Sequence, residues 1–192
     1  VTGVNYTADY CLYTQIPDSN FESALETLGY DDISGDGQVP TALISGVTSL
    51  SVTYESISDL TGIEDFTALT VLTASNNDLS TVDISNNTNL ESLSVESNSL
   101  TTIDVSALTN LQTLRVGRND ITTLDLSNNT GLLTLHVNNN DNMSVLDLSN
   151  NTLLYRLDIS YCNFSDFDMS GLVNMDELTV DSNPLTSLDL SA

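Results

Sequence analysis

The side chains that could bind an anion are few in this chain of 192 residues, which has three Arg, one His and no Lys beside 27 Asp and Glu. All four basic side chains lie between residues 115 and 156, and two tyrosines lie close to them in the sequence. Arg pairs with carboxylates, sulfates or phosphates through its planar fork, and Tyr rings pack on peptides or sugars. The candidate ligand-binding side chains are therefore Arg115, Arg118, His136, Tyr155, Arg156 and Tyr161.

A second candidate site is a calcium loop that begins at residue 32 and copies the first eight positions of an EF-hand loop. The twelfth position, which is a bidentate Glu in EF-hands, is Leu43, so carboxylates that precede the loop would have to complete the coordination shell. The same residues also suit an acidic turn that contains glycine, and the sequence favours neither interpretation. The candidate calcium ligands are Asp32, Ser34, Asp36 and Gln38 of the loop, with Asp31, Glu22 or Asp18 from the preceding segment.

The sequence gives no indication of catalysis. It holds a single His and lacks a Cys–His motif, a nucleophile elbow and a phosphate loop, so we expect that the protein is not an enzyme. The net charge of -24 argues against nucleic acid and anionic membranes as partners, because both require clustered basic residues. No stretch approaches the roughly 20 apolar residues that span a bilayer, so we expect no membrane insertion.

The elements that must position these residues follow from an internal repeat. The pattern Leu-x-x-Leu-x-Val-x-x-Asn-x-Leu recurs every 21 or 22 residues, as in the segment 90–100. Each unit alone cannot bury its apolar edge, so neighbouring units must stack. We predict a leucine-rich-repeat solenoid, a right-handed coil of the α/β type with a parallel β-sheet on its concave face and loops or short helical turns on its convex side. Seven repeats over residues 47–192 start at residues 47, 69, 90, 111, 132, 154 and 175.

Two polar rows accompany the apolar pattern. Asn at the ladder position should bond backbone groups where the chain leaves each strand, and Cys162 takes that position in the sixth repeat, so we expect a buried thiol there. On the return side an Asp recurs within an apolar-Asp-apolar-Ser unit, and we interpret it as an acceptor for backbone N–H groups rather than as a calcium ligand. This row contains Asp83, Asp104, Asp125, Asp147, Asp168 and Asp189.

Residues 1–46 break the repeat and are predicted to be an N-terminal cap that covers the end of the solenoid. A helix is expected from about residue 19 to residue 28, with Ser19 and Glu22 forming a capping box and Gly29 ending the helix.

The repeat predicts that all six candidate ligand-binding residues lie on the concave face, where adjacent strands are about 4.8 Å apart. They would then form a continuous cationic and aromatic patch. The alternative is internal charge pairing, of His136 with Asp158, of Arg156 with Glu177 and of Arg118 with Glu96, each contributing about 0–1 kcal/mol at an exposed site.

The repeats from residue 47 onward, together with the helical cap and its truncated EF-hand-like loop, make the chain resemble bacterial leucine-rich-repeat surface proteins of the internalin type. The resemblance implies a secreted or cell-surface module for binding or adhesion, with a protein or glycan ligand that could be anionic. A structural display stalk or spacer without a specific ligand is the alternative. A structural calcium ion is the one cofactor that the sequence suggests.

Overall fold

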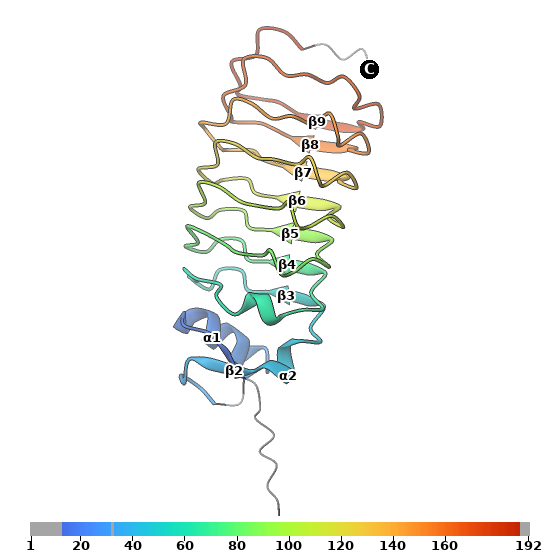
Figure 1. The fold of residues 1–192 in the computed structure, drawn as a ribbon. Coiled ribbons are helices and arrows are strands. Elements are labelled where there is room, and N and C mark those ends of the chain that lie inside the picture. Colours follow the sequence, from blue (N-terminus) through green and yellow to red (C-terminus); the bar gives the residue numbers. More distant parts are fainter. Residues whose placement is uncertain (1–12, 32, 189–192) are drawn as a thin grey trace, which may run out of the picture.

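The computed structural model describes residues 13–31 and 33–188. Seven three-residue strands stack in sequence order into one parallel sheet, β3 to β9, along one side of an elongated coil (Figure 1). The predicted parallel-sheet solenoid is confirmed, and the described part has few helices. The strands are β3 (Ser49–Ser51), β4 (Val71–Thr73), β5 (Ser92–Ser94), β6 (Thr113–Arg115), β7 (Thr134–His136), β8 (Arg156–Asp158) and β9 (Glu177–Thr179).

The strands form because the central Leu of each one points into the coil while its two neighbours point outward. Leu114, for example, is fully buried, and it is in register with Leu93 on one side and Leu135 on the other. Burial of such a side chain contributes about 1.5–3 kcal/mol, and stacking lets every coil share this gain with its neighbours. The core is therefore one continuous apolar column along the stack.

Asn side chains hold the coils together where the chain leaves the sheet. The Oδ1 of Asn119 accepts a hydrogen bond from the N–H of Leu100 in the preceding coil at 3.0 Å. Its Nδ2 donates to the carbonyls of Val95 and Val116, both at 3.0 Å. The predicted ladder role of Asn is confirmed, and Cys162 is buried at this position with a free thiol.

The N-terminal segment contains β1 (Tyr13–Gln15) and β2 (Gln38–Pro40), which pair antiparallel, and the helices α1 (Ser19–Thr27) and α2 (Thr41–Ile44). It lies below β3 in Figure 1, and Phe21 of α1 stacks on Phe66 of the first coil. This coil also contains the one described 3-10 helix, η1 (Ile63–Asp65). The domain boundary at residue 46 remains a prediction.

The predicted helix is present, and Gly29 follows it in the left-handed region at φ 81°. The predicted capping box is wrong. Asp18 is the N-cap, with its carboxylate accepting from the backbone N–H groups of Asn20 and Phe21, while the carboxylate of Glu22 accepts from the N–H of Gly37 at 2.7 Å. The side chain of Glu22 is buried and points at the loop before β2, so it does not reach back to the helix start.

Candidate recognition surface

The open side of the sheet carries two rows of side chains, one on each side of the central leucines, which we call the strand face. In one row Arg115 on β6 is in register with His136 on β7, which is in register with Asp158 on β8. Arg156 begins β8 in the other row and pairs in register with Thr134. The structure thus brings Arg115, His136 and Arg156 onto one face of three neighbouring strands. Neighbouring strands of a sheet are about 4.8 Å apart.

Arg156 has an ion-pair partner within the molecule. Its Nε lies 2.6 Å from the Oε2 of Glu177 on β9, an ion pair in which the N–H does not point along the line to the oxygen. The guanidinium also lies over the ring of Tyr155, 5.8 Å from the ring centroid. Tyr155 immediately precedes β8 and is 39% exposed, so it borders the strand face. The predicted pairing of Arg156 with Glu177 is confirmed.

Arg115 has no such partner. Within residues 13–31 and 33–188, Arg156 and Glu177 form the only ion pair with a nitrogen-to-oxygen distance of 4.0 Å or less. Neither the predicted pairing of His136 with Asp158 nor that of Arg118 with Glu96 is present among these residues. The carboxylate of Asp158 instead accepts from the N–H and hydroxyl of Ser160, at 3.0 and 2.6 Å.

His136 is half-buried on β7, between Arg115 on β6 and Asp158 on β8. Burial lowers the pKa of its imidazole below the usual range, and the charge of Arg115 lowers that pKa further. The carboxylates of Glu96 and Asp158 act in the opposite direction, and Arg156 adds a smaller lowering. The imidazole is therefore neutral at pH 7, and the positive charge of this face comes from the arginines.

Two predicted members of the patch lie elsewhere. Arg118 and Tyr161 follow β6 and β8 by three residues, in the turn where the chain leaves the sheet, and both have left-handed backbone with φ 55° and 53°. The prediction of one six-residue concave patch is wrong for these two, because each strand is only three residues long and the chain has already turned.

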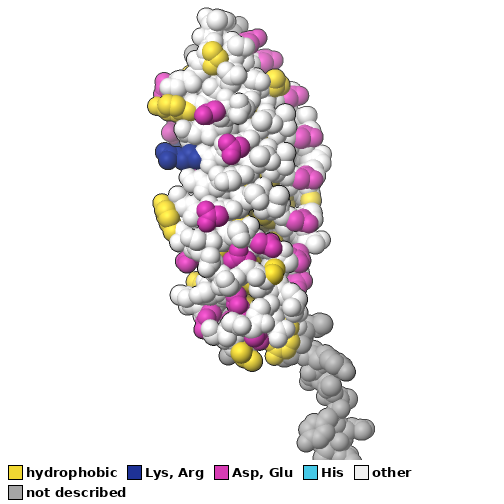
Figure 2. Space-filling view, turned by 90° about the vertical axis from the view of Figure 1, so that its left-hand side faces the viewer, with side chains coloured by type: hydrophobic (Ala, Val, Ile, Leu, Met, Phe, Trp, Pro, Cys, Tyr) yellow, Lys and Arg dark blue, Asp and Glu magenta, His cyan; other side chains and the backbone are white. Residues whose placement is uncertain are grey.

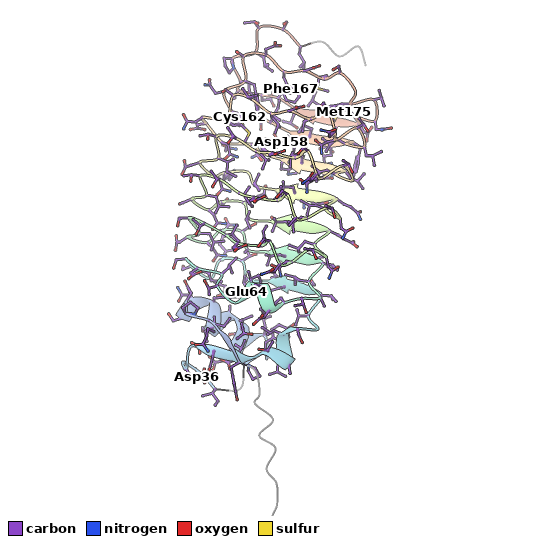
Figure 3. The ribbon with its side chains drawn as sticks, viewed as in Figure 1. Asp36, Glu64, Asp158, Cys162, Phe167 and Met175 are labelled. Carbon is purple, nitrogen blue, oxygen red and sulfur yellow. The ribbon has the colours of Figure 1, made fainter. Side chains whose placement is uncertain are left out.

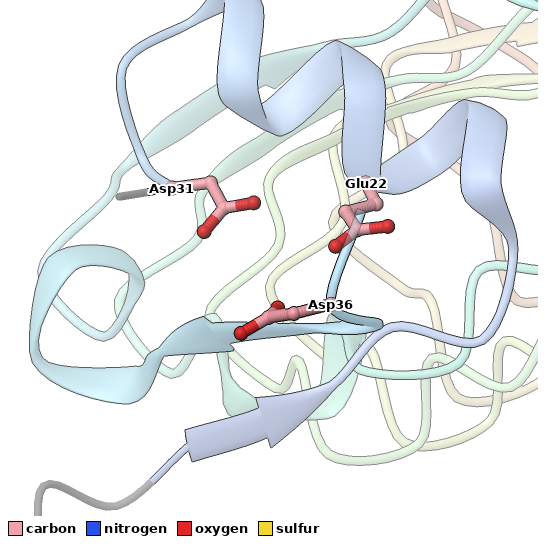
Figure 4. Close-up of side chains that lie close together, drawn as sticks. All are labelled: Glu22, Asp31 and Asp36. Carbon is pink, nitrogen blue, oxygen red and sulfur yellow. The ribbon is translucent and has the colours of Figure 1, made fainter. Parts of the chain in front are cut away.

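The carboxylates of Glu22, Asp31 and Asp36 converge between α1 and β2, with ligand oxygens within 4.8 Å of one another (Figure 4). Asp36 lies at the opposite end of the stack from Asp158 of the strand face (Figure 3). The hydroxyl of Ser34 donates to Glu26, so it does not join the cluster, and the side-chain amide of Gln38 donates to Asp36 at 3.2 Å.

Asp18 is not part of the carboxylate cluster either. Its second carboxylate oxygen accepts from the N–H and hydroxyl of Ser58 and from the N–H of Asp59, which ties α1 to the first coil. Burial alone would raise the pKa of Asp18, but these hydrogen bonds outweigh it and lower that pKa. Asp32 and Asp189 lie outside the described residues.

The aspartate row on the return side has the predicted backbone role. Asp104, for example, accepts from the N–H of Ser106 at 2.9 Å. The hydroxyl and the N–H of the serine two residues on lower the pKa of each described carboxylate of the row. Asp59 makes the same contact with Thr61 and so extends the row into the first coil, where Thr in place of Ser hid the pattern.

On the side of the molecule away from the strands, acidic side chains greatly outnumber basic ones (Figure 2). Figure 2 shows a regular column of acidic side chains along one edge of this side and very few basic atoms. On the strand face, by contrast, the strands β3 to β9 carry two acidic side chains, Asp158 and Glu177, so few carboxylates of the strands oppose an anionic group there.

The repeat, the parallel sheet and the Asn ladder define a leucine-rich-repeat protein. The sequence pattern of the family described as Leucine Rich Repeat matches residues 89–111. The functional domain of InlJ from Listeria monocytogenes, which includes a cysteine ladder, is 31% identical, with a TM-score of 0.72 over 93% of this chain and 45% of that one. InlF, an internalin from the same species, is 25% identical, with a TM-score of 0.77 over 90% of this chain and 58% of that one. Within its class, this chain is an internalin-like leucine-rich-repeat protein.

A leucine-rich-repeat protein of Leptospira interrogans shares the fold at 20% identity, with a TM-score of 0.57 over 67% of this chain and 41% of that one. The chain therefore spans 45% and 58% of the two Listeria proteins that it resembles. The search of curated proteins gave no match. In the part of the chain that the structure describes, no helix is both long and apolar enough to cross a membrane.

Proposed function

We propose that the chain is a secreted or cell-surface binding module that recognises an anionic group of a protein or glycan ligand through the strand face. The observation that supports this most is Arg115. In a chain with 27 acidic residues and three arginines, this guanidinium has no ion-pair partner among the described residues, although it lies half-buried beside His136. Solenoids of this kind offer extended surfaces for binding.

A carboxylate, sulfate or phosphate of the ligand would supply the ion-pair partner that Arg115 lacks among the described residues. Its guanidinium can donate two parallel hydrogen bonds to such a group, and His136, neutral at pH 7, can donate or accept one more. Tyr155 offers an aromatic surface at the border of the same face, held next to Arg156. Arg156 itself contributes less, because a ligand would first have to displace Glu177.

The test is binding of the labelled protein to printed arrays of extracellular proteins and glycans, followed by affinity measurement on the strongest ligand. We expect Arg115→Gln to weaken that affinity by about tenfold or more, which corresponds to about 1.4 kcal/mol. Ser51→Ala is the matched control, because Ser51 occupies the same row on β3, three strands away. Equal affinity of Arg115→Gln and wild type would contradict the proposal, and absence of any ligand would favour the display stalk.

We also propose that Glu22, Asp31 and Asp36 hold a structural calcium ion. Glu22 is only 4% exposed, and the three carboxylates converge within 4.8 Å. No Lys, Arg or His precedes Arg115 in the sequence, so the N-terminal segment carries acidic but no basic side chains. Buried charges are ordinarily paired or bound to metal, and carboxylate oxygens are the ligands that calcium prefers.

Calorimetry and thermal melting with calcium or with chelator test this second proposal. At a free calcium concentration of about 100 times Kd, the bound ion adds about 2.7 kcal/mol of stability. We therefore expect a Tm about 5–10 °C higher in calcium than in chelator. The variant Asp36→Asn should lose most of this difference, whereas Asp104→Asn, in the aspartate row, should keep it. Calcium that neither binds nor moves the Tm would show that the loop is an acidic turn only.

A further inference from the structure

In each of seven successive coils, the third residue after the strand has left-handed backbone, with φ between 53° and 65°. The conformation is enforced by contacts between coils, since the N–H of Arg118 donates to the carbonyl of Asn138 at 2.7 Å and that of Tyr161 to Asp181 at 2.8 Å. We call this set the edge row. It contains Tyr54, Asn76, Ser97, Arg118, Asn139, Tyr161 and Ser182.

Three members of the edge row are poorly suited to their backbone. Asn is enriched in left-handed conformation because its short polar side chain can bond locally, whereas a large side chain there is strained. Tyr54, Arg118 and Tyr161 nevertheless take positions that the other coils fill with Asn or Ser. Strain of this kind is found where a site requires the residue for function.

Packing within the molecule does not explain these three residues. Tyr54 is 76% exposed, Tyr161 is 54% exposed and Arg118 is also exposed. In the ranges 13–31 and 33–188, none of their side chains makes a hydrogen bond or ion pair. The backbone hydrogen bonds hold the strained conformation at these positions, but no hydrogen bond or ion pair of the three side chains explains why they are large.

We infer that Tyr54, Arg118 and Tyr161 form a second contact surface, which binds an extended peptide segment of a partner protein along the axis of the stack. The inference rests on the proposed function, since it assumes a recognition module, but it uses residues that lie off the strand face. At about 4.8 Å per coil, Arg118 is roughly 10 Å from Tyr161 and 14 Å from Tyr54 along the axis. An extended peptide of about seven residues spans that length.

The surrounding charges select the chemistry of the peptide. Exposed aspartates follow the edge row by two residues, at Asp78, Asp120 and Asp141, so a polyanionic glycan would be repelled on both sides of Arg118. A peptide with one acidic residue opposite Arg118, basic residues opposite the aspartates and apolar residues opposite Tyr54 and Tyr161 would satisfy every group. The favoured partner is thus a protein segment that is basic on balance.

The experiment selects binders from a displayed library of linear peptides of about 12 residues, long enough to span the edge row. Affinities of the enriched peptides are then measured on Arg118→Asn and Tyr161→Asn, and the Tm of each variant is recorded. We expect affinity about tenfold lower. We also expect an unchanged Tm or one higher by about 2–4 °C, because Asn relieves the strain. Ser182→Asn is the matched control, because Ser182 belongs to the same row but lies beyond Tyr161, and it should leave affinity unchanged.

Three results would overturn the inference. One is a selection that enriches no peptide; another is an enriched peptide that binds both Asn variants as tightly as wild type. The third is a Tm that falls in both Asn variants, because the large side chains would then serve the fold. If peptides of the second kind lose affinity with Arg115→Gln, they bind at the strand face and not at the edge row. If Arg115→Gln weakens binding of the array ligands but leaves the affinity for the selected peptides unchanged, the strand face and the edge row bind different ligands.

Discussion

Single carboxylates serve three different purposes in this acidic molecule. Those of the aspartate row accept bonds from their own turns, as Asp104 does from Ser106. Asp18 joins two elements, because one oxygen caps α1 and the other binds the first coil. Glu22 is buried and directed at the Asp31 and Asp36 carboxylates. Residue type alone does not separate these roles, because each depends on which N–H groups lie within reach.

The aspartate row makes stability depend on pH in a direction that can be worked out. The pKa of Asp104 is lowered by the hydroxyl and the N–H of Ser106, so its contribution to stability is present above the unfolded pKa of about 3.9 and is lost as the pH falls through the folded value. Between about pH 5 and pH 2, we expect the free energy of unfolding of Asp104→Asn to fall less steeply than that of wild type. Urea unfolding at each pH measures both slopes.

Ser106→Ala provides a second readout of the same contact, because it removes the hydroxyl and keeps the carboxylate. The pKa of Asp104, followed by NMR titration of its carboxyl carbon, should rise toward its ordinary value in this variant. An unchanged pKa would show that the backbone N–H alone sets it.

At the scale of the element, each coil owes its shape to the polar side chain that follows its strand. Asn119 binds one N–H and two carbonyls from two coils, all within the core. Its removal would leave the N–H of Leu100 buried without a partner. The carbonyls of Val95 and Val116 would lose one of their two amide donors, because they also accept from Asn98 and Asn140. The ladder thus links neighbouring coils as the sheet does, at the point where the strands have ended.

We expect Asn119→Ala to lower the free energy of unfolding by about 1–3 kcal/mol, measured by chemical denaturation. Asn110→Ala is the matched control, because the Nδ2 of Asn110 also donates to a carbonyl, that of Thr88 at 3.1 Å, but on the exposed surface. Its effect should be about 0.5 kcal/mol or less. Similar losses of unfolding free energy in the two variants would mean that burial of the ladder hydrogen bonds does not increase their contribution to stability.

The sequence predicted the strands well because the period of the repeat determines which residues stack. Leu114 and Asn119 could be assigned from spacing alone, and so could the alignment of Arg115 with His136. Arg118 was misplaced because the repeat gives the order of positions along a coil and not the residue at which the chain turns. The bond from Gly37 to Glu22 was missed because it joins two segments whose packing has no periodic signal.

At the scale of the whole molecule, charge and fold oppose each other. The net charge of -24 is spread over an elongated stack with acidic side chains in columns, so like charges recur from coil to coil. Self-repulsion of this kind destabilises the folded chain and is screened by salt. The unpartnered Arg115 is conspicuous against this background, because many carboxylates are available to the chain and none of the described ones is placed against it.

Screening should therefore stabilise the protein. Raising NaCl from about 0.01 M to about 1 M shortens the Debye length from about 30 Å to about 3 Å, and we expect the Tm to rise by several degrees. KCl should give the same increase, since screening does not distinguish the two cations. If the Tm does not change with either salt and rises only with calcium, the destabilising repulsion lies among Glu22, Asp31 and Asp36 rather than across the whole molecule.

The in-register stacking of coils also allows the length of the molecule to change by whole repeats. Each coil contacts only its neighbours, so duplicating or deleting one unit preserves every local contact at the new junction. A unit duplicated between Arg118 and Tyr161 would move these side chains apart by about 4.8 Å without altering either turn. Evolution or an engineer could thus adjust the distance between two anchoring residues in fixed steps and leave the chemistry of each unchanged.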